Sequence, residues 1–287
     1  MSEVLNDLLS LLELEKLEEN LFRGRSQDIG LKNVFGGQVI GQALSAAWQT
    51  VESDRSLHSF HSYFTLPGDA NTPIVYGVDR IRDGRSISTR RIRAIQNGKT
   101  IFFMTASFHL EAEGFDHQAT MPNVAGPENL SSELEFNRRH ADKIPEAIRK
   151  KFTCDRPIEM RPVEVYNPLD PKKSDPFRNI WMKAVGNLPD DPGIHMYLLA
   201  YASDFGFLVT AGQPHGVSLM TPKFQIATID HSMWFHRKFR FDDWLLYNIE
   251  STSASNERGF VQGKIYSREG ELVASSAQEG IMRFAKH

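Results

Sequence analysis

The chain carries one pattern of residues twice, about 170 positions apart. His61-Ser62 lies among aromatic residues in the first copy, and His231-Ser232 does so in the second, at an offset of 170. A turn glycine at Gly98 is matched by Gly270, at an offset of 172. Two nearly equal offsets indicate a duplicated unit. Two such units can pack side by side and leave a pocket between them, so the seam is where we expect the function.

Each copy is expected to contain an apolar helix followed by a meander of antiparallel strands. The run 37–51 is apolar or small on nearly every face, as in a helix enclosed by a sheet. The strands that follow are separated by Asp83-Gly84 and Asn97-Gly98, which are strong hairpin signals. These strands are predicted at 57–66, 74–82, 85–96 and 99–110.

The second copy repeats this order of elements. Its helix begins at Asp190-Asp191-Pro192, where an N-cap residue precedes a proline in the first turn, and is predicted to run to about residue 208. Strands are predicted before the helix around 163–166 and 177–186, and after it at 225–239, 244–253, 259–268 and 271–283. The sequence therefore predicts an α+β protein with an N-terminal unit at 1–115, a turn-rich linker at 116–155 and a C-terminal unit at 156–287.

The composition narrows the class of protein. The 287 residues are 40% hydrophobic and 24% charged, with a net charge of −3, which predicts a globular protein with no overall attraction to nucleic acid. No apolar run is long enough to insert across a membrane, and the N-terminus lacks the pattern of a secretory signal. The single Cys154 excludes an internal disulfide and fits a reducing compartment, so we expect a cytoplasmic protein.

Asp204 is the residue of the second helix that most needs an explanation. Its neighbours are almost all apolar, and a carboxylate enclosed by a sheet is costly unless it accepts hydrogen bonds or is protonated. It is either a functional group or a satisfied structural carboxylate. At the offsets above, Thr228 aligns with His58 and Gln278 with Ala106. Both polar residues can bind water, although an ordinary role in a strand explains either one alone.

The first helix offers backbone N–H groups where the second offers a carboxylate. Gly36, Gly37 and Gln38 stand at its start, and the N-terminus of a helix stabilises developing negative charge. The two glycines also fit a simpler role, which is close packing of the backbone. One copy is thus suited to polarising a carbonyl group, and the other to holding a water molecule.

Six arginines crowd two neighbouring predicted strands and their turn. A solvated sheet face explains them most simply, although guanidinium groups also suit the phosphates of a nucleotide-tailed ligand. They are Arg80, Arg82, Arg85, Arg90, Arg91 and Arg93. The histidines show no metal-ligand spacing and the chain has no Gly-x-Ser-x-Gly elbow, so we expect neither a bound metal or cofactor nor the common serine hydrolase fold.

Four longer runs resemble bacterial acyl-CoA thioesterase II over essentially the whole chain. They are Phe35-Gly36-Gly37-Gln38-Val39, the run 58–64, the run 229–236 and Gln278-Glu279-Gly280. The resemblance implies a double hotdog fold, in which two tandem antiparallel sheets each wrap around a long helix. It also implies hydrolysis of acyl-CoA to a free acid and coenzyme A, by a water molecule ordered by Asp204, Thr228 and Gln278.

Further contacts and partners follow as expectations. We expect the substrate carbonyl to be contacted by Gly36, Gly37 and His58. We expect the phosphates of coenzyme A to be contacted by Arg82, Arg85 and Arg91. A homodimer or homotetramer is expected by family analogy. Two alternatives stay open, which are a hotdog protein that binds acyl-CoA without hydrolysing it and an enoyl-CoA hydratase of the same fold.

Overall fold

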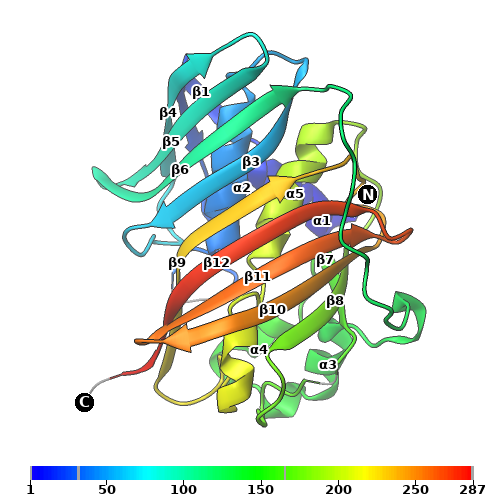
Figure 1. The fold of residues 1–287 in the computed structure, drawn as a ribbon. Helices are drawn as coiled ribbons and strands as arrows, with labels where there is room; N and C mark the ends of the chain where they lie inside the picture. The colour runs from blue at the N-terminus through cyan, green and yellow to red at the C-terminus, as the bar shows by residue number, and fades with distance from the viewer. Residues whose placement is uncertain (1, 31–32, 165, 286–287) are drawn as a thin grey trace.

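The chain folds around one continuous antiparallel sheet of twelve strands. The structure is a computed structural model, and it describes every residue except 1, 31–32, 165 and 286–287. The strand order is β1-β2-β4-β5-β6-β3-β9-β12-β11-β10-β8-β7 (Figure 1). The first copy supplies β1 Glu15–Glu18, β2 Leu21–Gly24, β3 Arg55–Phe64, β4 Ile74–Asp83, β5 Ile87–Gln96 and β6 Lys99–Leu110. The second supplies β7 Ile158–Pro162, β8 Phe177–Ala184, β9 Phe224–Phe235, β10 Leu245–Ser255, β11 Arg258–Ser267 and β12 Leu272–Phe284.

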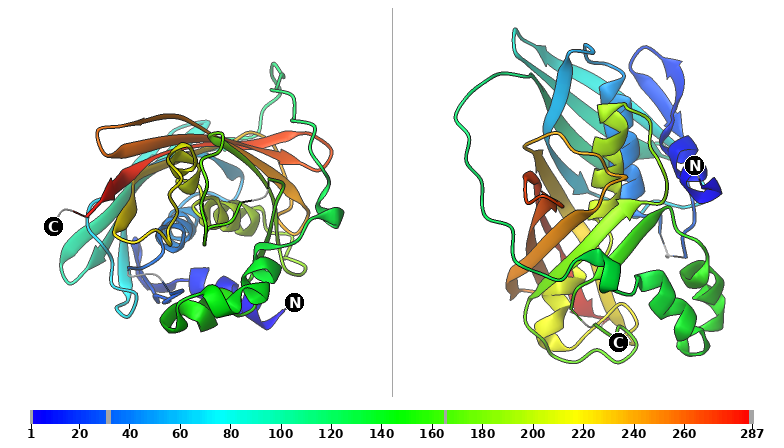
Figure 2. Two further views of the ribbon diagram at one scale, coloured as in Figure 1. Left: turned by 90° about the horizontal axis from the view of Figure 1, so that it is seen from below. Right: turned by 90° about the vertical axis from the view of Figure 1, so that its right-hand side faces the viewer.

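Two buried helices lie side by side against the concave face of this sheet. They are α2, Gly36–Trp48, and α5, Pro192–Ser203, and Figure 2 shows the sheet curving around both. Nearly every residue of α2 and α5 is buried, which explains why both read as apolar on all sides. The shorter helices are α1 Glu3–Leu12, α3 Glu133–Arg139, α4 Glu146–Thr153 and α6 Val209–Gly212. Of these, α1 packs on α2, so α2 is covered on both sides.

The two copies are joined edge to edge by β3 and β9. These strands pair antiparallel, with Ser62 opposite His231 and Tyr63 opposite Asp230. The expectation of two separate sheets is therefore corrected to one sheet with six strands from each copy. The physical reason is that an unpaired edge strand exposes a row of backbone N–H and C=O groups, and each copy satisfies the edge of the other.

The pairing registers give the true correspondence between the copies. Ala106 of β6 pairs with Phe60 of β3, and Gln278 of β12 pairs with His231 of β9. Because Ala106 and Gln278 correspond at the predicted offset of 172, Phe60 corresponds to His231. The offset in this pair of strands is thus 171 and not 170.

The same registers correct the counterpart of Thr228. Thr228 pairs with Gly280 in the second copy, and Leu57 pairs with Phe108 at the matching place in the first. Leu57, and not His58, is therefore the counterpart of Thr228. An error of one residue in a strand turns the side chain to the opposite face of the sheet, so it changes which residues are compared.

Four predicted elements end or begin three or more residues away. The helix predicted at 37–51 is α2, which ends at Trp48, and the strand predicted at 225–239 is β9, which ends at Phe235. Helix α5 ends at Ser203 and not near 208, because Asp204 is its C-cap residue and Gly206 adopts a left-handed φ of 63°. The strand predicted around 163–166 is β7, which lies at Ile158–Pro162. Residue 165 of that prediction lies outside the described residues.

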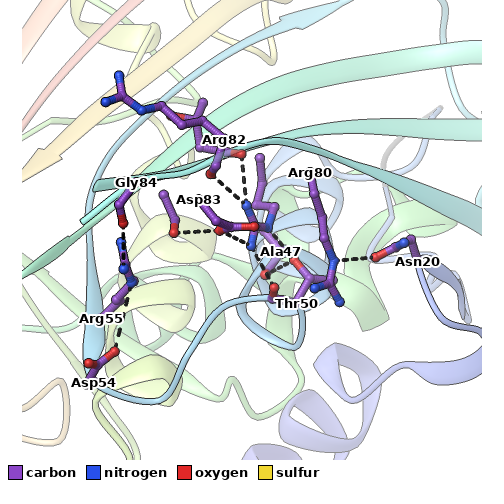
Figure 3. A network of polar contacts seen from close by, with 12 residues as sticks. Asn20, Ala47, Thr50, Asp54, Arg55, Arg80, Arg82, Asp83 and Gly84 are labelled. Carbon is purple, nitrogen blue, oxygen red and sulfur yellow. Dashed lines mark hydrogen bonds and ion pairs between the residues drawn. The ribbon is translucent and has the colours of Figure 1, made fainter. Parts of the chain in front are cut away.

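Arg90 is buried in the first copy, unlike the solvated arginine that the sequence favoured. Its guanidinium donates to the backbone oxygen of Thr50 at 2.8 Å and to Asp83 Oδ1 at 2.7 Å. Figure 3 labels these two acceptor residues. The guanidinium also donates to Thr50 Oγ1 at 2.9 Å, and only 1% of the side chain is exposed. Arg90 therefore ties the end of α2 to the β4–β5 hairpin.

We predict that Arg90→Ala lowers the free energy of unfolding by about 3 kcal/mol, because it leaves a cavity and removes the donors from Thr50. Urea unfolding measures this difference. Arg91→Ala, at the exposed neighbouring position, should change the same free energy by less than about 0.5 kcal/mol. Equal effects of the two variants would contradict a structural role for Arg90.

Candidate active site

Asp204 lies where the C-terminus of α5 meets the N-terminus of α2. The backbone N–H of Gly37 donates to Asp204 Oδ2 at 2.9 Å. A Cβ atom on Gly36 would lie 2.7 Å from the same carboxylate oxygen. A Cβ atom on Gly37 would lie under 3.0 Å from the backbone oxygen of Tyr201, a separation that real Cβ atoms essentially never show. The two glycines are therefore what lets the start of α2 reach the carboxylate.

The other two predicted residues come to the same carboxylate from the sheet. Thr228 Oγ1 of β9 donates to Asp204 Oδ1 at 3.4 Å. Gln278 Nε2 of β12 donates to Thr228 Oγ1 at 2.7 Å. Asp204 and Thr228 are partly exposed, whereas Gln278 is buried. The structure thus brings Asp204, Thr228 and Gln278 together, with the first two in reach of solvent.

Burial raises the pKa of Asp204 above its ordinary value of 3.8. The nearby His231, the Gly37 N–H and the hydrogen bonds from the side chains of Gln278 and Thr228 act in the opposite direction. A carboxylate with a raised pKa is a stronger base than one in water. The site can therefore hold a water molecule and accept a proton from it.

His231 belongs to this group of residues, and the sequence reasoning missed it. Its Nδ1 lies 2.8 Å from Gln278 Oε1, and its Nε2 lies 3.0 Å from Ser203 Oγ. It is fully buried, and burial lowers its pKa, although the Asp204 carboxylate pulls the other way. The available signal was that the second copy has histidine where the first copy has the aromatic Phe60. The offset of 170 concealed this signal, because it aligned His231 with the outward-facing His61.

His58, which was expected to contact the substrate carbonyl, is not grouped with Asp204. Its Nε2 lies 2.8 Å from Ser107 Oγ. The part of β3 that lies near Gly36 and Asp204 is Phe64, whose ring a Cβ on Gly36 would touch. His58 precedes Phe64 by six residues, which is about 20 Å along the strand at about 3.3 Å per residue. His58 was singled out as the counterpart of Thr228, and the corrected register removes that reason.

The arginines predicted to bind the coenzyme are not grouped with Asp204 either. Arg82 and Arg85 lie exposed at the β4–β5 turn. Arg55, the first residue of β3, donates to the backbone oxygens of Gly84 and Arg85, so this turn lies at the other end of β3 from Phe64. Arg91 is exposed in the middle of β5. Their contact with coenzyme A stays a prediction.

Among the residues that the structure describes, no three His, Cys, Asp or Glu side chains are grouped so that they could hold a metal ion. None of the helices in these residues combines the length and the apolar character that crossing a membrane requires.

The comparisons with known proteins fit this fold. A family model described as acyl-CoA thioesterase matches residues 147–281, and one described as acyl-CoA thioesterase N-terminal domain matches residues 22–109. A protein of unknown function with a hot dog fold from Alicyclobacillus acidocaldarius superposes with a TM-score of 0.79 at 19% identity, over 98% of this chain and 99% of that chain. The chain is therefore of the hotdog-fold class, with sequence models of thioesterases matching both halves.

Two relatives narrow this class to a family. The structure of acyl-CoA thioesterase II TesB2 from Mycobacterium marinum superposes with a TM-score of 0.78 at 37% identity, over 97% of this chain and 99% of that chain. Acyl-CoA thioesterase 2 from Haemophilus influenzae is 46% identical over 286 residues, which is 100% of both chains. The chain belongs to the acyl-CoA thioesterase II family, as the resemblance indicated.

Proposed function

We propose that this protein hydrolyses acyl-CoA thioesters to a carboxylic acid and coenzyme A, through a water molecule held by Asp204, Thr228 and Gln278. The single observation that carries this proposal is the Asp204 carboxylate, which takes one hydrogen bond on each oxygen and stays in reach of solvent at the N-terminus of α2. Membership of the acyl-CoA thioesterase family supports the substrate class.

The reaction follows from the donors and acceptors around Asp204. Each carboxylate oxygen keeps a lone pair after accepting from Gly37 or Thr228, and that lone pair can accept from water. The water oxygen bonds to the thioester carbon while one of its protons passes to Asp204. The C–S bond then breaks, and the thiolate leaves and takes up the proton that Asp204 accepted, which restores the carboxylate. A thiolate is a good leaving group, so no strong general acid is required.

The negative charge on the substrate oxygen needs a hydrogen-bond donor. Gly37 was the expected donor, but its N–H already donates to Asp204. Among the described residues, no group accepts a hydrogen bond from the N–H of Gly36, the first residue of α2. We therefore assign the Gly36 N–H to the substrate oxygen, aided by the positive end of the helix dipole.

The release of free thiol from palmitoyl-CoA or decanoyl-CoA, followed with a disulfide dye, tests the proposal. We expect steady thiol release and formation of the free acid. Binding of acyl-CoA without thiol release would instead identify a non-hydrolytic binding protein. Consumption of an enoyl-CoA without thiol release would identify a hydratase.

The dependence of kcat/KM on pH follows from the state of Asp204. A protonated carboxyl group cannot accept a proton from water, so the rate should fall as the pH falls through its pKa. Because burial raises this pKa, we expect the midpoint of the acid limb above 3.8. A pH profile measured where the protein stays folded tests this, and a midpoint at or below 3.8 would contradict it.

The proposal extends to the two halves of the chain and to the number of chains in the protein. We propose that each half of the sheet with its buried helix is a hotdog unit, which makes the chain a double hotdog with units at 1–115 and 156–287 joined by the linker 116–155. We also propose that the chain forms a homodimer or homotetramer. Light scattering on the purified protein measures the number of chains, and a monomer at working concentrations would exclude the assembly.

A further inference from the structure

A chain of four hydrogen bonds lies behind the Asp204 carboxylate, and the backbone closes it into a ring. Ser203 Oγ is 3.0 Å from His231 Nε2, and His231 Nδ1 is 2.8 Å from Gln278 Oε1. Gln278 Nε2 is 2.7 Å from Thr228 Oγ1, which is 3.4 Å from Asp204 Oδ1. Ser203 and Asp204 are neighbours in the chain, so the five residues form a ring.

Only the second copy carries this ring on its strands. The pairing registers match Thr228, His231 and Gln278 with three apolar residues of the first copy, which are Leu57, Phe60 and Ala106. The hotdog unit thus folds with apolar side chains at these places. Buried polar side chains need hydrogen-bond partners to avoid a cost in free energy, whereas apolar side chains need none, so the ring points to a role in the site that only this copy contains.

The position of each hydrogen follows from the carboxylate, which only accepts. Thr228 has one hydroxyl hydrogen, and if Asp204 receives it, the Thr228 oxygen must accept from the NH2 group of Gln278. The carbonyl oxygen of Gln278 then faces His231, so His231 Nδ1 must carry a hydrogen. Every hydrogen bond in the ring then points toward Asp204.

The surroundings of the imidazole favour this tautomer. Burial lowers the pKa of His231, so the imidazole is neutral and carries a single hydrogen on one of its two nitrogens. With that hydrogen on Nδ1, Nε2 must accept, and Ser203 Oγ is the donor in reach. Ser203 then gives its hydrogen to His231 instead of the backbone oxygen of Ala200, which lies 2.8 Å away. The rings of Phe60 and Phe207 hold the imidazole from two sides.

The other tautomer would disconnect the carboxylate. If His231 Nδ1 carried no hydrogen, it would need a donor, and the amide of Gln278 would turn over to supply one. The carbonyl oxygen of Gln278 would then face Thr228 and take its only hydrogen. Asp204 would lose the hydrogen bond to Oδ1 and keep only that from Gly37.

We infer that His231 is a positioning residue for the hydrolysis: it fixes the orientation of the Gln278 amide and thereby directs the hydroxyl hydrogen of Thr228 to Asp204. This inference rests on the function proposed above. His231 is 0% exposed, so it acts on the site through its hydrogen bond to Gln278. The charged groups that act on the His231 imidazole are Asp204 and Asp230. The Tyr247 hydroxyl donates to the backbone oxygen of Ser203, the residue next to His231 Nε2.

Two substitutions separate positioning from packing. His231→Phe places at this site the residue found at the matching place in the first copy, so it keeps a bulky ring but no donor. His231→Asn keeps an N–H close to the position of Nδ1. In His231→Phe we expect kcat to fall about 10- to 100-fold while KM stays within about twofold of the wild type. In His231→Asn we expect kcat to stay within about fivefold of the wild type. His236→Phe, which removes an exposed histidine bonded to Ser275 of β12, is the matched control and should leave kcat unchanged.

The outcomes distinguish this inference from the proposed function. A wild-type protein that releases no thiol overturns both. A wild-type protein that hydrolyses acyl-CoA, with an unchanged kcat in folded His231→Phe or an equal loss in His231→Asn, overturns only the role of His231. If His231→Phe does not fold, Ser203→Ala decides the matter. It removes the donor to Nε2 and should lower kcat about 3- to 10-fold, and an unchanged kcat overturns the inference.

Discussion

Replacing Asp204 with asparagine should lower kcat by about two to four orders of magnitude and leave the protein folded. Asparagine has nearly the same shape, so Gly37 N–H can still donate to its amide oxygen. The amide cannot take a proton from water, however. Because burial already disfavours the charged carboxylate, the neutral side chain should not lower the free energy of unfolding. Thiol release at saturating acyl-CoA measures the effect on kcat.

Asp230→Asn is the matched control for this substitution. Asp230 lies on β9, its pKa is also raised by burial, and its Oδ1 accepts from the backbone N–H of Glu279 at 3.0 Å. It has no hydrogen bond to the ring around Asp204. The kcat of Asp230→Asn should stay within a few-fold of the wild type. Near-normal turnover in folded Asp204→Asn would instead remove Asp204 from the reaction.

Replacing Gly37 with alanine should reduce kcat at least about 100-fold and lower the free energy of unfolding by about 1 to 3 kcal/mol. The added Cβ would lie under 3.0 Å from the backbone oxygen of Tyr201 in α5, and a backbone atom cannot rotate away. The start of α2 must therefore move away from α5. That movement separates the Gly37 N–H from Asp204 Oδ2 and displaces the Gly36 N–H as well.

Gly77→Ala serves as the control for the glycine substitution. Gly77 lies in β4, and a Cβ there would meet nothing within 4 Å. We expect an unchanged kcat and a change in the free energy of unfolding below about 0.5 kcal/mol. Kinetics and urea unfolding on both variants provide the measurement. A fully active Gly37→Ala protein would show that the close approach of α2 to α5 is not needed for turnover.

The elements of the fold could be predicted where the signal is local. The hairpin dipeptides Asp83-Gly84 and Asn97-Gly98 separate β4, β5 and β6, whose observed bounds lie within about two residues of the predicted ones. The pairing of β3 with β9 could not be predicted in this way. It joins residues about 170 positions apart, and no short run of sequence encodes such a contact.

The site was predicted in part, and the missing part has a physical reason. Asp204 was predicted from its polarity in an apolar helix, Thr228 and Gln278 from their contrast with the first copy, and all three from the family resemblance. His231 was missed, and His58 was set opposite Thr228, because the two copies were aligned one residue out of register in these strands. The matching pairs His61-Ser62 and His231-Ser232 suggested that register, although the strand pairing sets Phe60, and not His61, at the place of His231. Both strands carry a register irregularity at the corresponding place, between Leu57 and Ser59 and between Thr228 and Asp230, and only the long-range pairing reveals the phase.

A single turnover in H₂¹⁸O tests most directly the claim that Asp204 activates water. Enzyme in excess over acyl-CoA is quenched after one turnover, and mass spectrometry locates the label in the fatty acid and in the peptide that contains Asp204. Direct attack by water predicts one ¹⁸O atom in the released acid and none in Asp204. Label in the Asp204 carboxyl group, with an unlabelled acid from the first turnover, would show that Asp204 attacks the thioester itself and would contradict the account.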